Sequence, residues 1–501
     1  MVRASFFYKM TNLIKHSGQV FTPEYLVNLI LDEAGYNGVD ILQKHCIDNS
    51  CGDGAFLCEI VSRYIKAYRE ANEDEEKLPY EIFTYIHGIE LDPVAYQNCL
   101  DNLKATCESL GVECNHFDVT NADTLSLHGF DGKMDFVIGN PPYVRVHNLD
   151  DSYDAVKSFS FANGGMTDLY LVFFEKGFQM LKDGGKLCYI TPSSWLNSVA
   201  GGVMRDYIRR NHNLVSLIDL EHYQAFKATT YTLISLFEKG GRRNEFSYCV
   251  FDPNTLGKKH IENLSFSEID INNYFYLAQH GILQSLKDIL CSKLPKYVSV
   301  KNGFATLADK IFIADSFPFK EYVIRTIKAS TGKWYHAFFP YDSNGKPIPK
   351  EQIFANQEVA EYLNSNKSNL LKDSTEDKNP YWYLFGRTQA LKDVASDKLS
   401  LNTTIKDVKS LKINRVNAGE GLYSGLYILT DFDFDVIIDL LRTERFISYI
   451  ASLKKYKSGG YYTYNSKDLE SFLNYEIQKL IDNGNVQIPS TEQCGLFAGH
   501  F

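Results

Sequence analysis

Long apolar runs and secretion signals are missing from this 501-residue sequence. It contains no uninterrupted apolar stretch of about 18 residues, the length that a membrane-spanning helix requires. The N-terminal sequence MVRASFFYKMTNLIKHSGQ also lacks a long apolar segment ending at a small-residue cleavage site. We therefore expect a cytoplasmic protein with no membrane partner.

Metal-binding cysteine patterns are missing as well. Ten cysteines occur, but no two form a C-x-x-C pair, and none has the cysteine and histidine spacing typical of zinc sites. We expect reduced, mostly buried thiols and no metal site.

Neither charge sign dominates the whole chain, which has 52 Lys+Arg and 62 Asp+Glu. The charges are unevenly distributed, however. Residues 1–240 carry 20 basic and 32 acidic residues, whereas residues 241–501 carry 32 and 30. The second half is therefore better suited to contact a polyanion.

Apolar segments alternate with amphipathic ones between about residues 20 and 240, a pattern that predicts an open, mostly parallel α/β sheet. The expected strands are 44–48, 83–90, 113–118, 134–139, 186–191, 214–219 and 230–237. The expected helices are 23–34, 55–71, 93–110, 168–182 and 198–211.

After residue 240 this alternation gives way to aromatic, lysine-containing segments such as 333–342, 379–387 and 456–469. No fixed period repeats, so a solenoid or propeller is not indicated. We place the domain boundary near Gly240-Gly241 and predict domains 1–245 and 246–501.

The sequence Asp48-Asn49-Ser50-Cys51-Gly52-Asp53-Gly54 lies between an expected strand and an expected helix. Glycines there allow a tight turn and close approach to a ligand at the carboxyl end of a sheet. The next expected strand ends at Glu90, where an ionised carboxylate can accept hydrogen bonds from both hydroxyls of a ribose. Together the two segments predict a ligand that contains adenosine.

A second motif, Asn140-Pro141-Pro142-Tyr143, follows the expected strand 134–139. The Asn140 amide oxygen and a backbone carbonyl held by the prolines can both accept hydrogen bonds from one amino group. The Tyr143 ring can stack on the heterocycle that carries this amino group. The alternative is a rigid loop in which the tyrosine only packs.

The order of these motifs resembles the gamma group of DNA adenine-N6 methyltransferases, of the type II restriction-modification kind. The resemblance covers about residues 18–240 and includes the segments 21–23, 121–123 and 168–196. Segments 302–313 and 454–469 are loosely similar to the recognition domains of type II modification enzymes. The resemblance implies a Rossmann-like methyltransferase domain with a mixed, mostly parallel sheet, followed by a C-terminal α+β target-recognition domain.

The resemblance also implies that S-adenosylmethionine is the cofactor. The residues it places around this cofactor are Thr22, Asp48, Gly52, Glu90, Asp123, Pro142 and Phe173. Asp118 is an alternative to Asp123 as the partner of the adenine amino group, because it ends the preceding expected strand. Phe173 could instead be an ordinary apolar residue on its helix.

The implied reaction is methyl transfer to the amino group of an adenine rotated out of the DNA duplex. Asn140 and the Pro141 carbonyl would accept hydrogen bonds from this amino group. Pro142 would fix the loop, while Tyr143 and Phe226 would stack on the two faces of the base. A packed Phe at the end of a strand is an alternative for Phe226.

Double-stranded DNA is the expected partner. In the segment Val144–Gly165, which we expect to order over DNA, Arg145 is a candidate phosphate contact. The candidates in the second half lie around Gly459-Gly460 and are Lys454, Lys455, Lys457, Tyr461 and Tyr462. RNA or a protein glutamine is the alternative acceptor.

About 17 residues precede the first cofactor motif, too few for an N-terminal nuclease domain. We therefore expect this chain to methylate without cleaving. We also expect a monomer. A cognate restriction endonuclease, if one exists, would be encoded separately.

Overall fold

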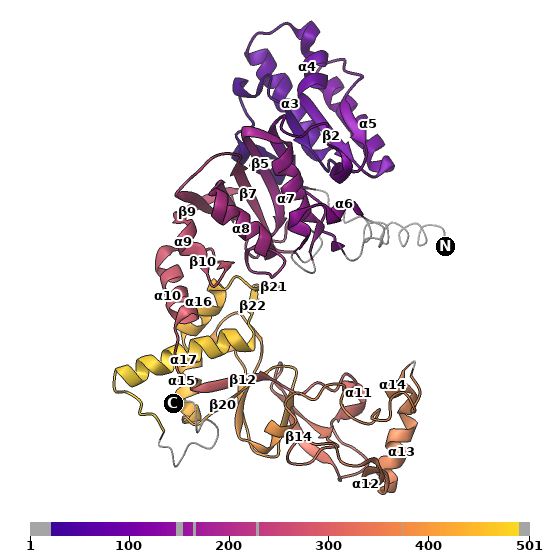
Figure 1. Cartoon of the computed structure of the whole chain (residues 1–501), viewed down its shortest axis with the longest axis vertical. Helices are drawn as coiled ribbons and strands as arrows, with labels where there is room; N and C mark the ends of the chain where they lie inside the picture. Colours follow the sequence, from indigo (N-terminus) through magenta and orange to yellow (C-terminus); the bar gives the residue numbers. More distant parts are fainter. Residues whose placement is uncertain (1–21, 147–153, 164–166, 227–229, 373, 490–501) are drawn as a thin grey trace. The chain divides into compact units, whose positions relative to one another are not determined.

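The computed structural model describes residues 22–146, 154–163, 167–226, 230–372 and 374–489 (Figure 1). The chain divides into two compact units, Met1–Gln284 and Ser285–Phe501. Across the described ranges, no helix combines the length and the apolar character needed to cross a bilayer.

A nine-stranded sheet in the order β3-β2-β1-β4-β5-β7-β6-β8-β9 forms the centre of the first unit. Strands β1 to β5 run parallel, and β7 pairs antiparallel with both β5 and β6. The strands are β1 (Cys46–Asp48), β2 (Ile86–Glu90), β3 (Asp118–Asn121), β4 (Met134–Gly139), β5 (Leu181–Pro192), β6 (Leu214–Asp219), β7 (Thr232–Glu238), β8 (Glu245–Asp252) and β9 (Gly257–Ser265). This arrangement confirms the predicted mixed, mostly parallel α/β fold.

Helices cover both faces of this sheet. On one face α2 packs against α3 and α3 against α5, with Cys188 and Ile190 of β5 in the same core. On the other face Tyr189, between those two residues, packs on Phe174 of α7 with ring centroids 5.4 Å apart. The unit's helices are α2 (Glu24–Ala34), α3 (Ala55–Glu70), α4 (Leu78–Tyr85), α5 (Pro93–Ser109), α6 (Asp154–Lys157), α7 (Leu169–Met180), α8 (Gly202–Asn211), α9 (Phe266–Ile269) and α10 (His280–Cys291), which reaches into the second unit.

The local sequence explains where the two helices α5 and α3 begin. Pro93 is the first residue of α5, and the Asp92 side chain caps the helix by accepting from the Val94 N–H at 2.7 Å. Gly54 precedes α3 with φ of +91°, and a Cβ there would lie 2.8 Å from Sγ of Cys99. Only glycine meets both demands at this turn.

The first unit extends beyond the predicted boundary at residue 245. Strand β8 pairs parallel with β6, and β9 pairs antiparallel with β8, so residues 245–265 continue the same sheet. A short β10–β11 hairpin (Asp270–Ile271 and Tyr274–Phe275) follows. The division observed between Gln284 and Ser285 therefore lies after the predicted one.

The second unit combines three small sheets with seven helices, counted over the described residues. The sheets have the orders β12-β20-β16-β18, β13-β15-β14-β19 and β17-β22-β21. Their strands are β12 (Val298–Asn302), β13 (Ile313–Ala314), β14 (Val323–Lys328), β15 (Lys333–Phe338), β16 (Lys398–Leu401), β17 (Thr404–Ile405), β18 (Ile413–Val416), β19 (Gly421–Tyr423), β20 (Leu426–Thr430), β21 (Tyr456–Lys457) and β22 (Tyr461–Thr463). The helices are α11 (Asp309–Phe312), α12 (Lys350–Phe354), α13 (Gln357–Ser365), α14 (Lys367–Leu371), α15 (Phe434–Leu441), α16 (Glu444–Ser452) and α17 (Ser466–Asp482).

Most of the aromatic side chains singled out in segments 333–342 and 379–387 are buried in this unit. They share one apolar cluster, whose members include Phe338, Phe339, Tyr341, Trp382, Tyr383 and Phe385. These two segments therefore contribute mainly to the core.

Candidate active site

The candidate site lies along the carboxyl edge of the first unit's sheet. The strand order reverses between β1 and β4, because β2 and β3 follow on one side and β5 on the other. In open α/β sheets, ligands bind outside the strand ends at such a reversal. Asp48 ends β1, Glu90 ends β2 and Asn140 directly follows β4.

Asp48 is almost fully buried, with 1% of its surface exposed. Its Oδ1 accepts a hydrogen bond from the Ser50 N–H at 3.1 Å. A Cβ built on Gly139 would lie 2.5 Å from the same oxygen, so β4 can approach Asp48 only with glycine at that position. Burial, reinforced by the charge of Glu90, raises the pKa of Asp48 from its ordinary 3.8 to about 7.

Two backbone amides fix the Glu90 carboxylate. The Gly52 N–H donates to Oε2 at 2.8 Å, and the Asp92 N–H donates to Oε1 at 2.8 Å. Gly52 has φ of +56°, which suits the tight turn expected after β1. Each carboxylate oxygen has a second lone pair, so the group can still accept hydrogen bonds from a ligand.

The structure separates Asp118 from Asp123. Asp118 begins β3 and bonds His87 Nδ1 at 2.6 Å. It therefore lies toward the amino end of the strand, not at its end as the sequence interpretation assumed. Asp123 follows the carboxyl end of β3, where its side chain accepts from the Leu125 N–H at 3.0 Å. Of the two acids, Asp123 is the one on the edge that carries Glu90.

Asn140 is held from two sides. Its Nδ2 donates to Thr22 Oγ1 at 3.0 Å, and its backbone carbonyl accepts from Ser50 Oγ at 3.5 Å. The structure thus brings together three segments that are far apart in the sequence: the start of the described chain, the loop after β1 and the NPPY motif.

Tyr143 lies among aromatic rings beside β5. Its hydroxyl donates to the Ile190 carbonyl at 3.0 Å. The Phe226 ring meets it edge to face, with centroids 6.2 Å apart, and the Tyr170 ring does the same at 6.4 Å. Burial raises the pKa of the Tyr143 hydroxyl, so it remains a neutral donor.

Tyr170 was not among the predicted site residues. It lies on α7 with 1% of its surface exposed, and its hydroxyl is 3.0 Å from Ser194 Oγ. Segment 168–196 contains Tyr170 and Ser194 and carries part of the family resemblance. The spacing of residues in this segment did not show which of its side chains would contact Tyr143.

The remaining cofactor predictions are Pro142 and Phe173. Pro142 is half-buried in the NPPY loop, and Phe173 is buried on α7, which packs on β4 and β5. Both assignments remain predictions.

The predicted DNA contacts differ in how accessible they are. Arg145 is exposed, with Nε 4.0 Å from the Asp168 carboxylate; the segments 147–153 and 164–166 of its loop lie outside the described residues. Lys457 and Tyr461 are exposed on the β21–β22 hairpin, whose turn contains Gly459 and Gly460.

Three further residues of this hairpin region are less exposed. Lys455 forms an ion pair with Asp468 at 2.6 Å and is half-buried, so its charge is already compensated within the protein. Lys454 Nζ lies 5.8 Å from the centre of the Tyr456 ring, and Tyr462 is half-buried beside that same ring.

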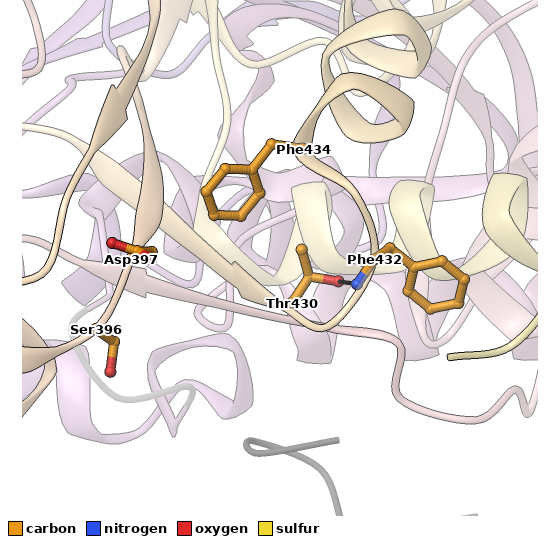
Figure 2. Close-up of a pocket in the computed structure, with 5 residues that line it drawn as sticks. All are labelled: Ser396, Asp397, Thr430, Phe432 and Phe434. Carbon is orange, nitrogen blue, oxygen red and sulfur yellow. Dashed lines mark hydrogen bonds between the residues drawn. The ribbon is translucent and has the colours of Figure 1, made fainter. Parts of the chain in front are cut away.

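A separate cavity of about 360 Å³ lies in the second unit (Figure 2). It is lined by Ser396, Asp397, Thr430, Phe432 and Phe434. The Thr430 hydroxyl accepts from the Phe432 N–H at 3.2 Å, and Asp397 accepts from the Ala418 N–H at 2.7 Å. None of the predicted site residues lines this cavity.

The residues at the sheet edge fit S-adenosylmethionine. Glu90 presents a fixed carboxylate suited to ribose hydroxyls, and Asp123 presents an acceptor suited to an amino group. Asp48 offers a buried carboxylate next to Asn140, and an adjacent cation would favour its ionised form. Within the described residues, no cluster of three or more metal-ligating side chains was found.

The chain is similar to known restriction-modification proteins. Residues 56–226 match the family model of the Eco57I restriction-modification methylase. The chain is 24% identical to the type II restriction enzyme and methyltransferase RM.Eco57I of Escherichia coli, over 87% of this chain and 54% of that protein. It is 28% identical to the type II methyltransferase M.PaeR7I of Pseudomonas aeruginosa, over 45% of this chain and 40% of that protein.

The chain thus spans about half the length of these curated relatives. Among solved structures, the type IIL restriction-modification enzyme MmeI in complex with DNA has a similar fold, with a TM-score of 0.56 and 13% identity. That match covers 94% of this chain and 70% of MmeI. The predicted methyltransferase fold and its cofactor, S-adenosylmethionine, are confirmed. Through residues 56–226 the chain is similar to the Eco57I restriction-modification methylases.

Proposed function

We propose that the chain is a site-specific DNA methyltransferase that modifies the N6 amino group of adenine in double-stranded DNA. The observation that carries this proposal is the position of the NPPY motif. It follows β4 at the strand-order reversal, with Asn140 bonded to Thr22 and Gly139 in close approach to buried Asp48. Acceptors for an amino group thereby lie beside the carboxylates that suit the cofactor.

The adenine amino group is a poor nucleophile because its lone pair is delocalised into the ring. In this proposal the Asn140 side-chain oxygen and the Pro141 carbonyl accept hydrogen bonds from the two N–H groups. These bonds localise electron density on nitrogen and stabilise the positive charge that develops there. The cofactor supplies a methyl group already activated for transfer, so the chain's own task is alignment.

Access to the amino group requires the adenine to leave the base stack, at a cost of about a few kcal/mol. In this proposal Tyr143 receives one face of the extruded base. Its hydroxyl bond to Ile190 and its contact with Tyr170 hold the ring in position. Phe226, which meets Tyr143 edge to face, is the proposed partner for the other face.

We propose that the second unit recognises the DNA sequence. Lys457 and Tyr461 are the exposed candidates on its β21–β22 hairpin. Lys455 is withdrawn from this role because Asp468 already pairs with it. Arg145 remains the proposed phosphate contact of the first unit. The candidate protein partner is a cognate restriction endonuclease, which would be encoded separately.

The test is transfer of labelled methyl from S-adenosylmethionine to unmethylated genomic DNA, followed by nucleoside analysis. We expect N6-methyladenine, and we expect Asn140→Ala to lower its rate of formation by about 100-fold or more while cofactor binding persists. Asn211→Ala is the matched control, because Asn211 bonds only the Tyr207 carbonyl on α8 among the contacts described for it. Label in RNA or in protein glutamine would instead support the alternative acceptors.

A further inference from the structure

Leu307 combines two unfavourable properties at one surface position. It lies between β12 and α11 with φ of +58°, a left-handed backbone conformation that non-glycine residues rarely adopt. Its side chain is 59% exposed, although it is large and apolar. A residue kept under strain and in contact with water is a candidate for a functional contact.

The backbone on both sides of Leu307 is fixed by hydrogen bonds. Phe304 N–H donates to the Leu422 carbonyl at 3.1 Å, and the Thr306 carbonyl accepts from the Gly386 N–H at 2.9 Å. The Ala308 N–H donates to Thr306 Oγ1 at 3.0 Å. These bonds hold the loop backbone in place around Leu307, whose apolar side chain is exposed.

Gly386 makes room for this side chain. A Cβ built on Gly386 would lie only 2.5 Å from Cδ1 of Leu307, so the leucine rests directly on the glycine backbone. Gly386 is itself exposed. The leucine and the 386–387 segment therefore form one continuous surface.

Leu256 shows that strain and exposure also occur together at an ordinary turn. This residue is also an exposed leucine with positive φ, at 44% exposure and +54°. It ends the turn that joins the antiparallel strands β8 and β9, where a left-handed residue closes the hairpin. Leu307 joins a strand to a helix, and no strand pairing requires its conformation.

Two exposed cations lie near the leucine along the chain or next to the glycine that it contacts. Lys310 follows three residues later at the start of α11, and Arg387 follows Gly386. Neither forms an ion pair with any residue in the described part of the chain. The nearest acid in the sequence, Asp309, accepts a hydrogen bond from the Thr306 hydroxyl. The surface thus combines an exposed apolar side chain with two cations that form no ion pair and with one carboxylate, that of Asp309.

We propose that Leu307 inserts between base steps of duplex DNA while Lys310 and Arg387 contact the adjoining phosphates. Duplex DNA matches this combination, because it offers an anionic backbone and an apolar stack that a leucine can enter. Insertion kinks the duplex and makes binding depend on how easily the local sequence deforms. This inference rests on the proposed function and adds a DNA-contacting surface, which comprises Leu307, Lys310, Gly386 and Arg387.

The test is photo-crosslinking of the full chain with p-benzoylphenylalanine at position 307 or, as the matched control, at position 256. The probe is sheared, unmethylated genomic DNA. We expect crosslinks from position 307 at a yield at least about fivefold above that from position 256. Equal yields, or no crosslink from position 307, would overturn the proposal.

A second measurement compares Leu307→Gly with Leu256→Gly. Glycine relieves the left-handed strain at both sites, so neither variant should melt at a lower temperature than the parent. We expect Leu307→Gly to lower kcat/KM for DNA methylation by at least about fivefold, whereas Leu256→Gly leaves it unchanged. If the parent methylates DNA and Leu307→Gly equals it, the contact is refuted and the proposed function stands. If position 307 crosslinks but the parent transfers no methyl to DNA, the reaction is refuted and the contact stands.

Discussion

The rings of Tyr143 and Phe226 meet edge to face, with centroids 6.2 Å apart and planes at 77°. A base stacked between two parallel rings needs them about 7 Å apart, twice the contact distance of roughly 3.5 Å. The two rings therefore touch each other where the proposed adenine would lie. Phe226 must turn or withdraw before the base can enter, whereas Tyr143 is anchored by its bond to Ile190.

Substitutions of Tyr143 should separate the roles of its ring and its hydroxyl. Tyr143→Phe keeps the stacking face but leaves the Ile190 carbonyl without this donor, so we expect near-parental kcat/KM and a loss of about 1 kcal/mol in the free energy of unfolding. Tyr143→Ala removes the face and should lower kcat/KM by about tenfold to 100-fold, in line with about 1–3 kcal/mol for a base stacked on an aromatic ring. Initial rates and urea unfolding measure both. Equal rates for the two variants would contradict the stacking role.

The ionisation of Asp48 should make cofactor binding depend on pH. Its pKa of about 7 means that the carboxyl is largely protonated below neutrality in the cofactor-free protein. A cationic cofactor favours the ionised form, so the Kd for S-adenosylmethionine should fall as pH rises through about 7. Calorimetric titration between pH 6 and about 8 measures this. Asp48→Asn should bind more weakly and should lose this dependence.

The same pKa predicts how stability changes with pH. The folded state holds the Asp48 proton up to about pH 7, whereas the unfolded chain releases it near 3.8. Relative to Asp48→Asn, the cofactor-free parent should therefore lose stability as pH rises from about 4 to 7 and then level off, by up to about 4 kcal/mol. Urea unfolding of both proteins across this range provides the test, and a constant difference would contradict it.

Asp123 and Asp118 should respond differently to neutralisation. Asp123→Asn removes a charged acceptor from the cofactor edge, so we expect the Kd for S-adenosylmethionine to rise by about tenfold. Asp118→Asn weakens the bond to His87 at the other end of β3, so it should lower the melting temperature and leave that Kd unchanged. The assignment fails if Asp118→Asn has the larger effect on the Kd.

Lys457 and Lys455 form a matched pair two residues apart. Lys457 is exposed, and Lys457→Ala should reduce the slope of log affinity against log salt by about one for genomic DNA fragments. Lys455→Ala breaks the ion pair with Asp468, so it should cost stability and leave the salt slope unchanged. The measurement is DNA affinity between about 50 and 200 mM salt. Equal slopes for the two variants would exclude the hairpin as a phosphate contact.

Local pattern alone was enough to predict strands β4 and β6, because each is an apolar run bounded by turn residues. The local pattern failed where the pairing between strands determines the boundaries of an element. Residues 83–85, expected in a strand, end helix α4, and β2 begins only at Ile86. The expected strand 113–118 became β3 at Asp118–Asn121, because its register is set by pairing with His87–Glu90 of β2.

The candidate site likewise contains features that the local sequence predicts and features that only packing determines. The motifs placed Asp48, Glu90 and Asn140 on one edge, because parallel strands end together. They could not reveal that Asp468 pairs with Lys455, since the start of α17 must first pack beside the residue that precedes β21. Tyr170 was missed for the same reason: its contact with Tyr143 depends on how α7 lies against the sheet.

The two backbone hydrogen bonds that hold the Glu90 carboxylate have a consequence for how this loop can change during evolution. Both donors are main-chain amides, from Gly52 and Asp92, so the carboxylate's orientation does not depend on the side chains at those positions. Substitutions around these hydrogen bonds can accumulate as long as the turn keeps its backbone conformation. We therefore expect distant relatives to conserve the geometry of the Glu90 carboxylate better than the identities of the neighbouring residues.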